Sequence, residues 1–332
     1  MAHKTLIGGT AYEITGGKAL VNGTGYSIDK GKTLVGGTAY EVGFASWPDD
    51  LDTGLEFASA SPFTISVSSP KWDGTLEYSN GKEWTPWDGS EISSGKGENG
   101  HCIYIRGTGN TIISGSSSVL TYQWTLNGTD IECNGNIEKL LDYTTVLAGR
   151  HPTMASYCYK ALFMFCDALI KAPSLPATTL ASSCYYSMFS NCINLIEAPS
   201  LPATTLASSC YYSMFCNCRN LIKAPSLPAT TLADYCYRKM FESCRSLTEI
   251  PCLPATTLPV ECYFWMFASC DKIKVSSTET GTYTKAYRVP SVGDGTGNTS
   301  SMQNMFFNTG GTFTRTPEIN TTYYLDSSNT IV

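Results

Sequence analysis

The residues best suited to chemistry in this chain are its cysteines, and ten of the fourteen recur at a constant step of 26 residues. Thiolates bind metal ions, thiols oxidise in pairs to disulfides, and a free cysteine packs as a small apolar side chain. The pattern therefore predicts a metal site, a disulfide ladder or a regular core. The first column is Cys158, Cys184, Cys210, Cys236 and Cys262, and the second is Cys166, Cys192, Cys218, Cys244 and Cys270.

Spacing favours the regular core of reduced thiols. Cys184 and Cys192 would lie roughly 12 Å apart along a helix, which exceeds the ~7 Å limit between the Cα atoms of a disulfide. A zinc site needs thiolates that converge, whereas these columns run parallel, and the pair Cys216-x-Cys218 occurs in one repeat only. Disulfides between successive repeats and a metal site stay open as alternatives, although each column has an odd number of members.

Other candidates for catalysis are few. The three histidines, His3, His101 and His151, have no carboxylate or thiol at the spacing of a known motif. The segment GDGTGN (293–298) follows no predicted strand and precedes no predicted helix, so we interpret it as a turn rather than a phosphate loop. We expect no catalytic residue, no cofactor, no metal and no enzymatic activity.

The elements that carry the cysteines repeat five times without a change in length. Cys184, Met188, Cys192 and Leu195 are spaced 4, 4 and 3, which predicts a short helix with one apolar face. The remainder, LIEAPSLPATT, contains two prolines and is expected to be extended. Repeats that cannot bury their apolar face alone bury it by stacking, so the pattern predicts a solenoid. The segment LPATTL occurs at 175–180, 201–206, 227–232 and 253–258.

The repeat resembles the BspA-like leucine-rich repeats. Its pattern MF-x-x-C-x-x-L, followed by a proline, appears as MFSNCINLIEAP, MFCNCRNLIKAP and MFESCRSLTEIP. The resemblance covers about residues 137–275 and implies a leucine-rich-repeat solenoid. The first unit, ALFMFCDALIKAP, follows GRHPTM instead of LPATTL and is expected to act as a cap. Met305-Phe306 is expected to belong to a last, degenerate repeat.

A second repeat occupies the first 45 residues. The segments KTLIGGTAYEITGG, KALVNGTGYSIDKG and KTLVGGTAYEVGFA recur every 14 residues, and each predicts a small β-hairpin around a GGT or NGT turn. The array resembles terminal modules of structural proteins in tailed phages of gut bacteria. Such small hairpins are not stable alone, so we expect them to pack on other virion proteins or on copies of themselves, in a homo-oligomer with a trimer favoured.

The predicted fold class is mixed α+β with several domains. Residues 46–132 are rich in β-branched and aromatic residues between regular turns, which indicates a small β-sandwich. The predicted order is a β-hairpin array (1–45), the β-sandwich (46–132), a capped leucine-rich-repeat solenoid with a 26-residue period (133–275) and a C-terminal cap (276–332).

The candidate binding residues follow the core tyrosine of each repeat. Two interpretations stay open: this outward row binds a sugar or a partner protein, or it shields the outer face of the stack. Trp84 and Trp87 carry the same ambiguity, with core packing expected for at least one of them. A further column, Lys171, Glu197, Lys223 and Glu249, alternates in sign and is expected to aid solubility and register. The candidate row is Lys160, Tyr186, Tyr212, Arg238 and Phe264.

The charge and hydropathy of the chain indicate which partners to expect. The 22 Lys and Arg against 28 Asp and Glu give a formal net charge of -6, and there is no basic stripe, so we expect no nucleic acid partner. No apolar run approaches the ~18 residues of a membrane helix, so we expect no membrane insertion. The beginning of the sequence lacks the pattern of a signal peptide, and we therefore expect assembly in a host cytoplasm and a location in the virion.

These features predict a structural protein of a phage or prophage virion. We expect a fibre or receptor-binding component that contacts a host surface protein or glycan. The alternative is a BspA-like adhesin on a bacterial cell surface. A more remote alternative is an enzyme acting on glycans, which would need paired carboxylates in a cleft.

Overall fold

The computed structural model describes residues 50–332 except 69–70, 98 and 115–123, and within residues 1–49 it describes the backbone of six short strands. The chain divides into two compact units, Met1–Asp49 and Asp50–Val332. In the first unit each 14-residue repeat supplies one antiparallel pair of strands, β1 with β2, β3 with β4 and β5 with β6. Their bounds are β1 His3–Ile7, β2 Thr10–Thr15, β3 Lys18–Val21, β4 Thr24–Ser27, β5 Lys32–Val35 and β6 Thr38–Glu41.

The second unit begins with two sheets that share an aromatic core. In β7 the side chains alternate between the core and the surface, as a strand with one buried face requires. Phe57 of β7 lies 6.0 Å from Trp124 of β14 in the other sheet, measured between ring centroids. Strand order is β10-β9-β13-β7-β15-β16, with β12 beside β13, in one sheet and β11-β8-β14 in the other.

The bounds of these elements are η1 Leu51–Thr53, β7 Leu55–Ser59, β8 Thr64–Val67, β9 Thr75–Ser79, β10 Thr85–Pro86, β11 Ile92–Ser93, β12 Gly95–Gly97, β13 Gly100–Thr108, β14 Trp124–Asn127, β15 Ile131–Asn134 and β16 Leu169–Lys171. The helix α1 (Lys139–Leu147) packs on β13. Gly107 permits this approach, because a Cβ atom there would lie 1.8 Å from the carbonyl oxygen of Leu140.

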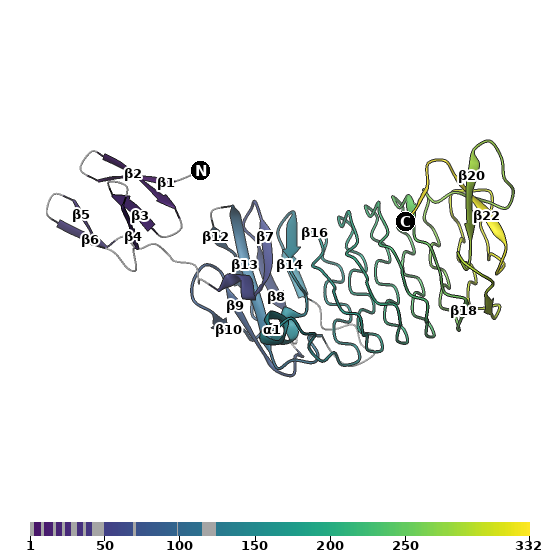
Figure 1. The fold of residues 1–332 in the computed structure, drawn as a ribbon, viewed down its shortest axis with the longest axis horizontal. Helices are drawn as coiled ribbons and strands as arrows, with labels where there is room; N and C mark the ends of the chain where they lie inside the picture. Colours follow the sequence, from purple (N-terminus) through teal and green to yellow (C-terminus); the bar gives the residue numbers. More distant parts are fainter. Residues whose placement is uncertain are drawn as a thin grey trace. The chain divides into compact units, whose positions relative to one another are not determined.

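The predicted class, a mixed α+β protein with a leucine-rich-repeat solenoid, is wrong. The described residues form strands and turns in several small sheets, and their single α-helix, α1, ends before the first repeat. The segment predicted as a helix, residues 184–195, is a succession of tight turns. We call each 26-residue repeat a coil and the coils from residue 157 to residue 309 the repeat stack. Figure 1 shows these coils following one another in unit two.

Positive backbone φ angles explain why no helix forms. Ser183, Ser187 and Asn191 have φ values of 56°, 53° and 63°, and the equivalent residues of the other coils do the same. An α-helix needs negative φ throughout, so one left-handed residue in every four converts the segment into linked turns. Residues four apart then lie on the same side, as they nearly do in a helix. That shared spacing is why the 4, 4, 3 pattern predicted the wrong element.

Alternate backbone N–H groups hold each turn and join it to the next coil. The N–H of Tyr186 donates to the carbonyl of Ser183 at 3.2 Å within the coil, and the N–H of Tyr185 donates to the carbonyl of Cys210 at 3.0 Å in the next coil. Pairs of residues point alternately inward and outward, so Cys184 and Tyr185 are buried, then Met188 and Phe189. This arrangement satisfies the backbone donors without a helix or a long strand.

Aromatic rings and thiols fill the interior of the repeat stack. Successive phenylalanines, from Phe163 to Phe306, stack with ring centroids 5.6–5.9 Å apart, and the tyrosines from Tyr159 to Tyr263 stack at 5.5–5.9 Å. The thiol of Cys192 donates to the carbonyl of Phe163 at 3.0 Å, and Cys218 donates to Phe189 at 3.1 Å. Each coil therefore completes the core of its neighbour.

The C-terminal residues continue and then cover the repeat stack. Phe306 stacks on Phe267 at 5.9 Å, so Met305-Phe306 belongs to a last coil. Beyond it, β19, β22 and β20 form an antiparallel sheet, while β17 pairs with β23 and β18 with β21 in parallel (Figure 1). Their bounds are β17 Glu249–Ile250, β18 Thr257–Leu258, β19 Val275–Ser276, β20 Tyr283–Arg288, β21 Thr296–Gly297, β22 Thr322–Asp326 and β23 Thr330–Ile331.

Candidate functional site

The five positions of the candidate row form one continuous column along the repeat stack, but they are less exposed than predicted: Lys160 is buried and the other four are half-buried. The rings of Tyr186 and Tyr212 are stacked with centroids 4.4 Å apart. The guanidinium carbon of Arg238 lies 5.6 Å from the ring centroid of Tyr212 and 4.3 Å from that of Phe264. The ammonium of Lys160 lies 5.2 Å from the ring of Tyr186. We call Lys160, Tyr186, Tyr212, Arg238 and Phe264 the outer ladder.

The four-residue turns position the outer ladder. In each coil the residue after the buried tyrosine begins an outward pair, so equivalent residues of successive coils meet side by side. The members of the ladder other than Lys160 are half-buried, because each side chain lies against the next. One position of the repeat therefore forms a continuous row in which each residue contacts its equivalent in the next coil.

The faces of the ladder rings are occupied by one another. Tyr186 lies between Lys160 and Tyr212, and Arg238 lies between Tyr212 and Phe264. Arg238 also donates from Nε to the hydroxyl of Tyr212 at 3.2 Å and forms an ion pair with Glu261. Ring edges and hydroxyl groups are therefore what the ladder offers to a ligand. A cation between two rings is stabilised by both ring quadrupoles, which stiffens the row.

The ladder hydroxyls are suited to hydrogen bonding rather than to proton transfer. Burial, reinforced by the neighbouring Tyr212, raises the pKa of Tyr186 to about 12. The phenol therefore stays protonated near neutral pH and both donates and accepts hydrogen bonds. Such an arrangement can hold a polar ligand but offers no general base at that pH.

A second aromatic group beside the ladder was not expected from the sequence. Trp265 lies 5.8 Å from Phe264 and 5.5 Å from Phe307, and the ammonium of Lys239 lies 4.8 Å from its ring. Phe307 has 45% of its surface exposed. The positions of Lys239 and Trp265 have positive φ and follow the ladder residue directly, so they complete the outward pair. The helical interpretation gave no reason to expect a second half-buried position beside the ladder; Lys239 and Trp265 occupy it, whereas the equivalent Ser187 and Ser213 are buried.

Trp84 and Trp87 do not join the outer ladder. Trp87 is 4% exposed and packs against Trp72 and Trp124, with ring centroids 5.7 and 5.2 Å away, so it is a core residue. Trp84 belongs to a separate cluster in which its Nε1 donates to Asp50 at 2.8 Å and Arg106 lies 3.9 Å above its ring.

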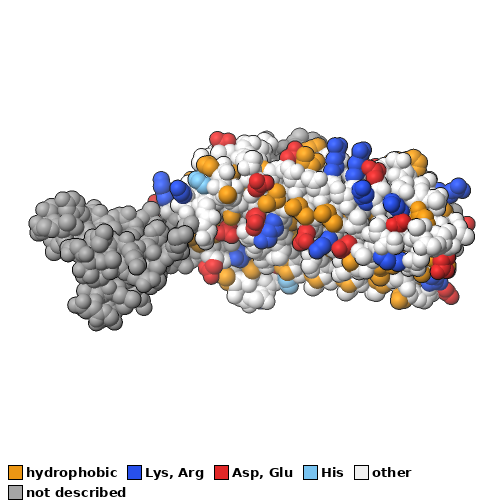
Figure 2. Space-filling model, turned by 90° about the horizontal axis from the view of Figure 1, so that it is seen from above, with side chains coloured by type: hydrophobic (Ala, Val, Ile, Leu, Met, Phe, Trp, Pro, Cys, Tyr) orange, Lys and Arg blue, Asp and Glu red, His pale blue; other side chains and the backbone are white. Residues whose placement is uncertain are grey.

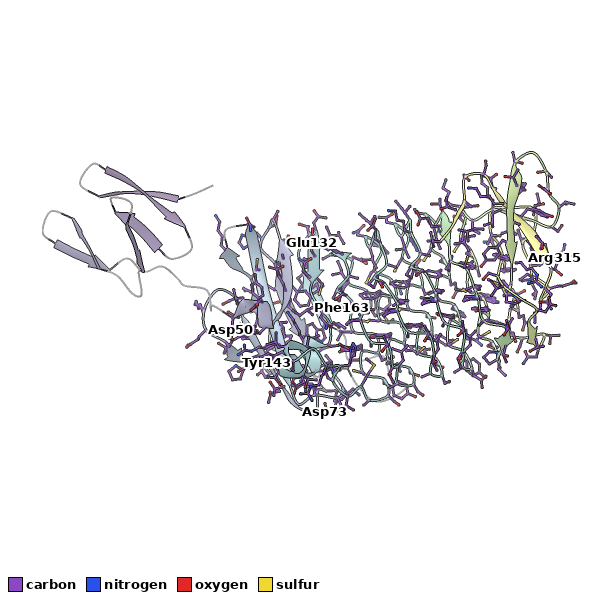
Figure 3. The ribbon with its side chains drawn as sticks, in the orientation of Figure 1. Asp50, Asp73, Glu132, Tyr143, Phe163 and Arg315 are labelled. Carbon is purple, nitrogen blue, oxygen red and sulfur yellow. The ribbon has the colours of Figure 1, made fainter. Side chains whose placement is uncertain are left out.

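The cluster at Trp84 clamps the beginning of the second unit. Arg106 pairs with Asp50 at 2.7 Å and with Glu77 at 3.0 Å, and its guanidinium carbon lies 4.5 Å from the ring of Tyr143. Figure 3 labels Asp50 and Tyr143 at this end of the unit. Arg106 is largely buried against the two rings, while its carboxylate partners Asp50 and Glu77 lie nearer the surface. The cluster is therefore organised as a structural anchor.

The cysteines are placed for packing rather than for reaction. All fourteen are free, and both columns of the repeat are buried. Burial raises the pKa of the Cys184 and Cys166 thiols to about 12, so the reactive thiolate is scarce near neutral pH. Within the residues described, no group of three or more His, Cys, Asp or Glu side chains is arranged to hold a metal ion.

One acid–imidazole pair, Glu138 and His151, was not predicted from sequence motifs. Nδ1 of His151 lies 2.8 Å from the carboxylate of Glu138, which is 1% exposed, and Asn136 donates to the same carboxylate at 3.5 Å. The two residues are 13 positions apart, which matches no local motif. Among the described side chains, no serine or cysteine is hydrogen-bonded to this pair.

Charges on the side of the second unit seen in Figure 2 are interspersed, with acidic and basic side chains next to one another and to apolar ones. The alternating column forms ion pairs: Lys223 lies 3.2 Å from Glu197, and Lys171 lies 3.2 Å from Glu132. Glu132 was missed because it comes from β15, outside the repeat. No helix in the described ranges is long and apolar enough to cross a membrane.

Comparisons of the chain with protein-family models, with curated proteins and with solved structures found no match in any of the three. The resemblances to BspA-like repeats and to tailed-phage structural proteins therefore stay predictions.

Proposed function

We propose that this chain is a structural binding protein of a phage or prophage particle, a fibre or receptor-binding component. Residues 1–45 attach it to other virion proteins or to copies of itself, and the repeat stack contacts a host surface protein or glycan. The observation that carries the proposal is the outer ladder, a row of interlocked aromatic and cationic side chains on a stack whose interior is filled by aromatic columns.

Two features support binding rather than catalysis. The thiols of the repeats are buried with raised pKa values, so their nucleophilic form is scarce. The ladder instead offers protonated hydroxyls, ring edges and a guanidinium, which are groups that recognise polar surfaces through hydrogen bonds. Because the ladder residues are immobilised by one another, a ligand loses little side-chain entropy on binding them.

The proposal is tested first on particles. Mass spectrometry of particles purified from lysates of a bacterium that carries this coding sequence should recover peptides of the chain in proportion to other virion proteins. Recovery from the washed cell surface with none in the particles would contradict the virion assignment and favour the adhesin.

Ladder variants test the binding surface. We expect Tyr186→Ser with Tyr212→Ser to lower the binding of the labelled protein to host cells at least tenfold, equivalent to about 1.4 kcal/mol, as measured by flow cytometry. Phe165→Ser is the matched control, because Phe165 is an exposed aromatic residue (57%) outside the ladder. Urea unfolding curves establish that the variants remain folded. Equal binding by both variants would show that the ladder only shields the stack.

A further inference from the structure

One face of the repeat stack exposes two isoleucines beside the alternating charges. Ile196 and Ile222 are equivalent residues of adjacent coils and are 48% and 44% exposed. The neighbouring column is Glu132, Lys171, Glu197, Lys223 and Glu249, joined by short parallel bridges from Lys171 to Glu197 and from Glu197 to Lys223. We call these isoleucines and charges the pairing face. Figure 3 labels Glu132 on the upper side, and Figure 2 views that side, where charges of both signs alternate in a row next to apolar side chains.

The charged side chains of the pairing face remain largely exposed even where they form ion pairs within one chain. The Glu197 and Lys223 side chains are 65% and 54% exposed although they lie 3.2 Å apart. Exposed pairs of this kind contribute about 0–1 kcal/mol to stability. Their exposed atoms and the adjacent isoleucines therefore remain available to a partner with a complementary pattern.

We propose that the pairing face binds the pairing face of a second copy of this chain, with the two stacks antiparallel. A two-fold axis lies in the interface, parallel to the short strands, between the coil of Glu197 and the coil of Lys223. Such an isologous contact places Glu197 opposite the second copy's Lys223, and Lys171 opposite its Glu249. It also places Ile196 opposite the second copy's Ile222, so the most exposed apolar side chains of the face are buried together.

Charge complementarity and the positions of the two isoleucines together select this register. An axis through the coil of Glu197 would bring Glu197 against itself and Lys171 against Lys223, which is repulsive at both positions. Shifting the axis by half a coil, to the position between Glu197 and Lys223, makes every facing charge pair opposite. Moving it one further coil toward Glu132 also pairs opposite charges but leaves Ile222 without an isoleucine partner.

This pairing goes beyond the proposed function and does not depend on it. Facing like charges would repel and facing opposite charges attract. Such contacts determine which partner and which register are bound more than they raise the affinity. A partner of another sequence would need the same alternation at the same spacing, ~4.8 Å per strand. A second copy of the chain has the same alternating charges at the same spacing, because its sequence is identical.

A cysteine already present allows a position-specific test. Cys252 is exposed and occupies the column that holds Ser174, Ser200 and Ser226 in the other coils. In the proposed dimer Cys252 faces Ser174 of the second copy. Within one chain the two positions are three coils apart, roughly 14 Å at strand spacing, which is beyond the ~7 Å limit for a disulfide.

We therefore expect the full-length Ser174→Cys protein to form a covalent dimer on mild oxidation, with a bond between residues 174 and 252 identified by mass spectrometry. The matched control Ser200→Cys lies in the same column but does not face Cys252, and it is two coils, roughly 10 Å, from Cys252 within one chain, so it should form at least tenfold less dimer. Equal cross-linking by both variants, or no 174–252 bond in a protein that sediments as a dimer, would overturn the proposed register.

Charge variants provide a second readout that needs no cysteine. Lys223→Glu should halve the mass observed by sedimentation relative to the wild-type chain, and Glu197→Lys combined with Lys223→Glu should restore it. Arg219→Glu makes the same charge change at an exposed position of the same coil and should leave the mass unchanged. A wild-type mass that stays at the single-chain value of 36.0 kDa at every concentration tested would overturn the proposal.

Discussion

At the residue scale, the constant spacing of the second cysteine column, Cys166 to Cys270, is explained by a hydrogen bond as well as by size. Cys244 donates from Sγ to the carbonyl of Phe215 at 3.1 Å, and Cys270 donates to Phe241 at 3.0 Å. In this second column each repeat thiol thus donates to a carbonyl that precedes it in the stack while its apolar sulfur fills the core. Sequence spacing predicted that these side chains pack, but it contained no signal for the donor role, because the acceptor lies in another coil.

Thiol labelling tests which cysteines are buried and whether they are reduced. In the native protein at pH 8 we expect Cys252, which is exposed, to react rapidly and the ten column cysteines to react slowly, because burial keeps their pKa values high. In denaturant without reductant all fourteen should react. A count far below fourteen in denaturant would show that the columns are oxidised to disulfides.

At the element scale, the burial pattern of each repeat was predictable but the element was not. Cys184, Met188 and Cys192 are fully buried, as their spacing of four indicated. A helix and a run of four-residue turns share that spacing, and they differ in the φ of the residue between, such as Ser187 at 53°. Asparagine, which tolerates the left-handed region, stands at a few of these positions, such as Asn191 and Asn217. Equivalent positions hold residues such as Lys239 and Trp265, so the residue types carry no consistent local signal for the turns.

Paired alanine substitutions distinguish the inner from the outer columns. Phe215 is fully buried between Phe189 and Phe241, so Phe215→Ala should lower the free energy of unfolding by about 3–5 kcal/mol. Tyr212→Ala removes a half-buried ring from the ladder and should cost only about 1 kcal/mol, the scale of one aromatic pair. Urea unfolding of both variants is the measurement. Similar losses would mean that the ladder belongs to the core.

At the scale of the whole molecule, the chain separates into units at Asp50. Residues 50–54 are held inside the second unit: Arg106 binds Asp50 and Thr53, and Lys139 donates to the carbonyls of Asp52 and Gly54. The sequence indicated a change of character near this point through its 14-residue repeats. It did not reveal the anchor, because Arg106 and Lys139 are distant in the chain and neither belongs to a motif.

Truncation tests the division of labour between the units. A chain that begins at Asp50 should remain folded, with an unfolding curve close to that of the full chain, because the second unit is compact by itself. Under the proposed function it should no longer enter particles. Particle content, measured by mass spectrometry beside the full chain, provides the comparison. Equal incorporation would show that residues 1–49 are not the attachment module.

The alternating charges restrict how the number of coils can change. Every coil presents the same interior columns, so the gain or loss of one coding repeat would leave the core intact. It would, however, set Lys beside Lys or Glu beside Glu along the row that now alternates from Glu132 to Glu249. A gain or loss of two repeats preserves the alternation. Descendants of this gene are therefore expected to differ in coil number by even steps.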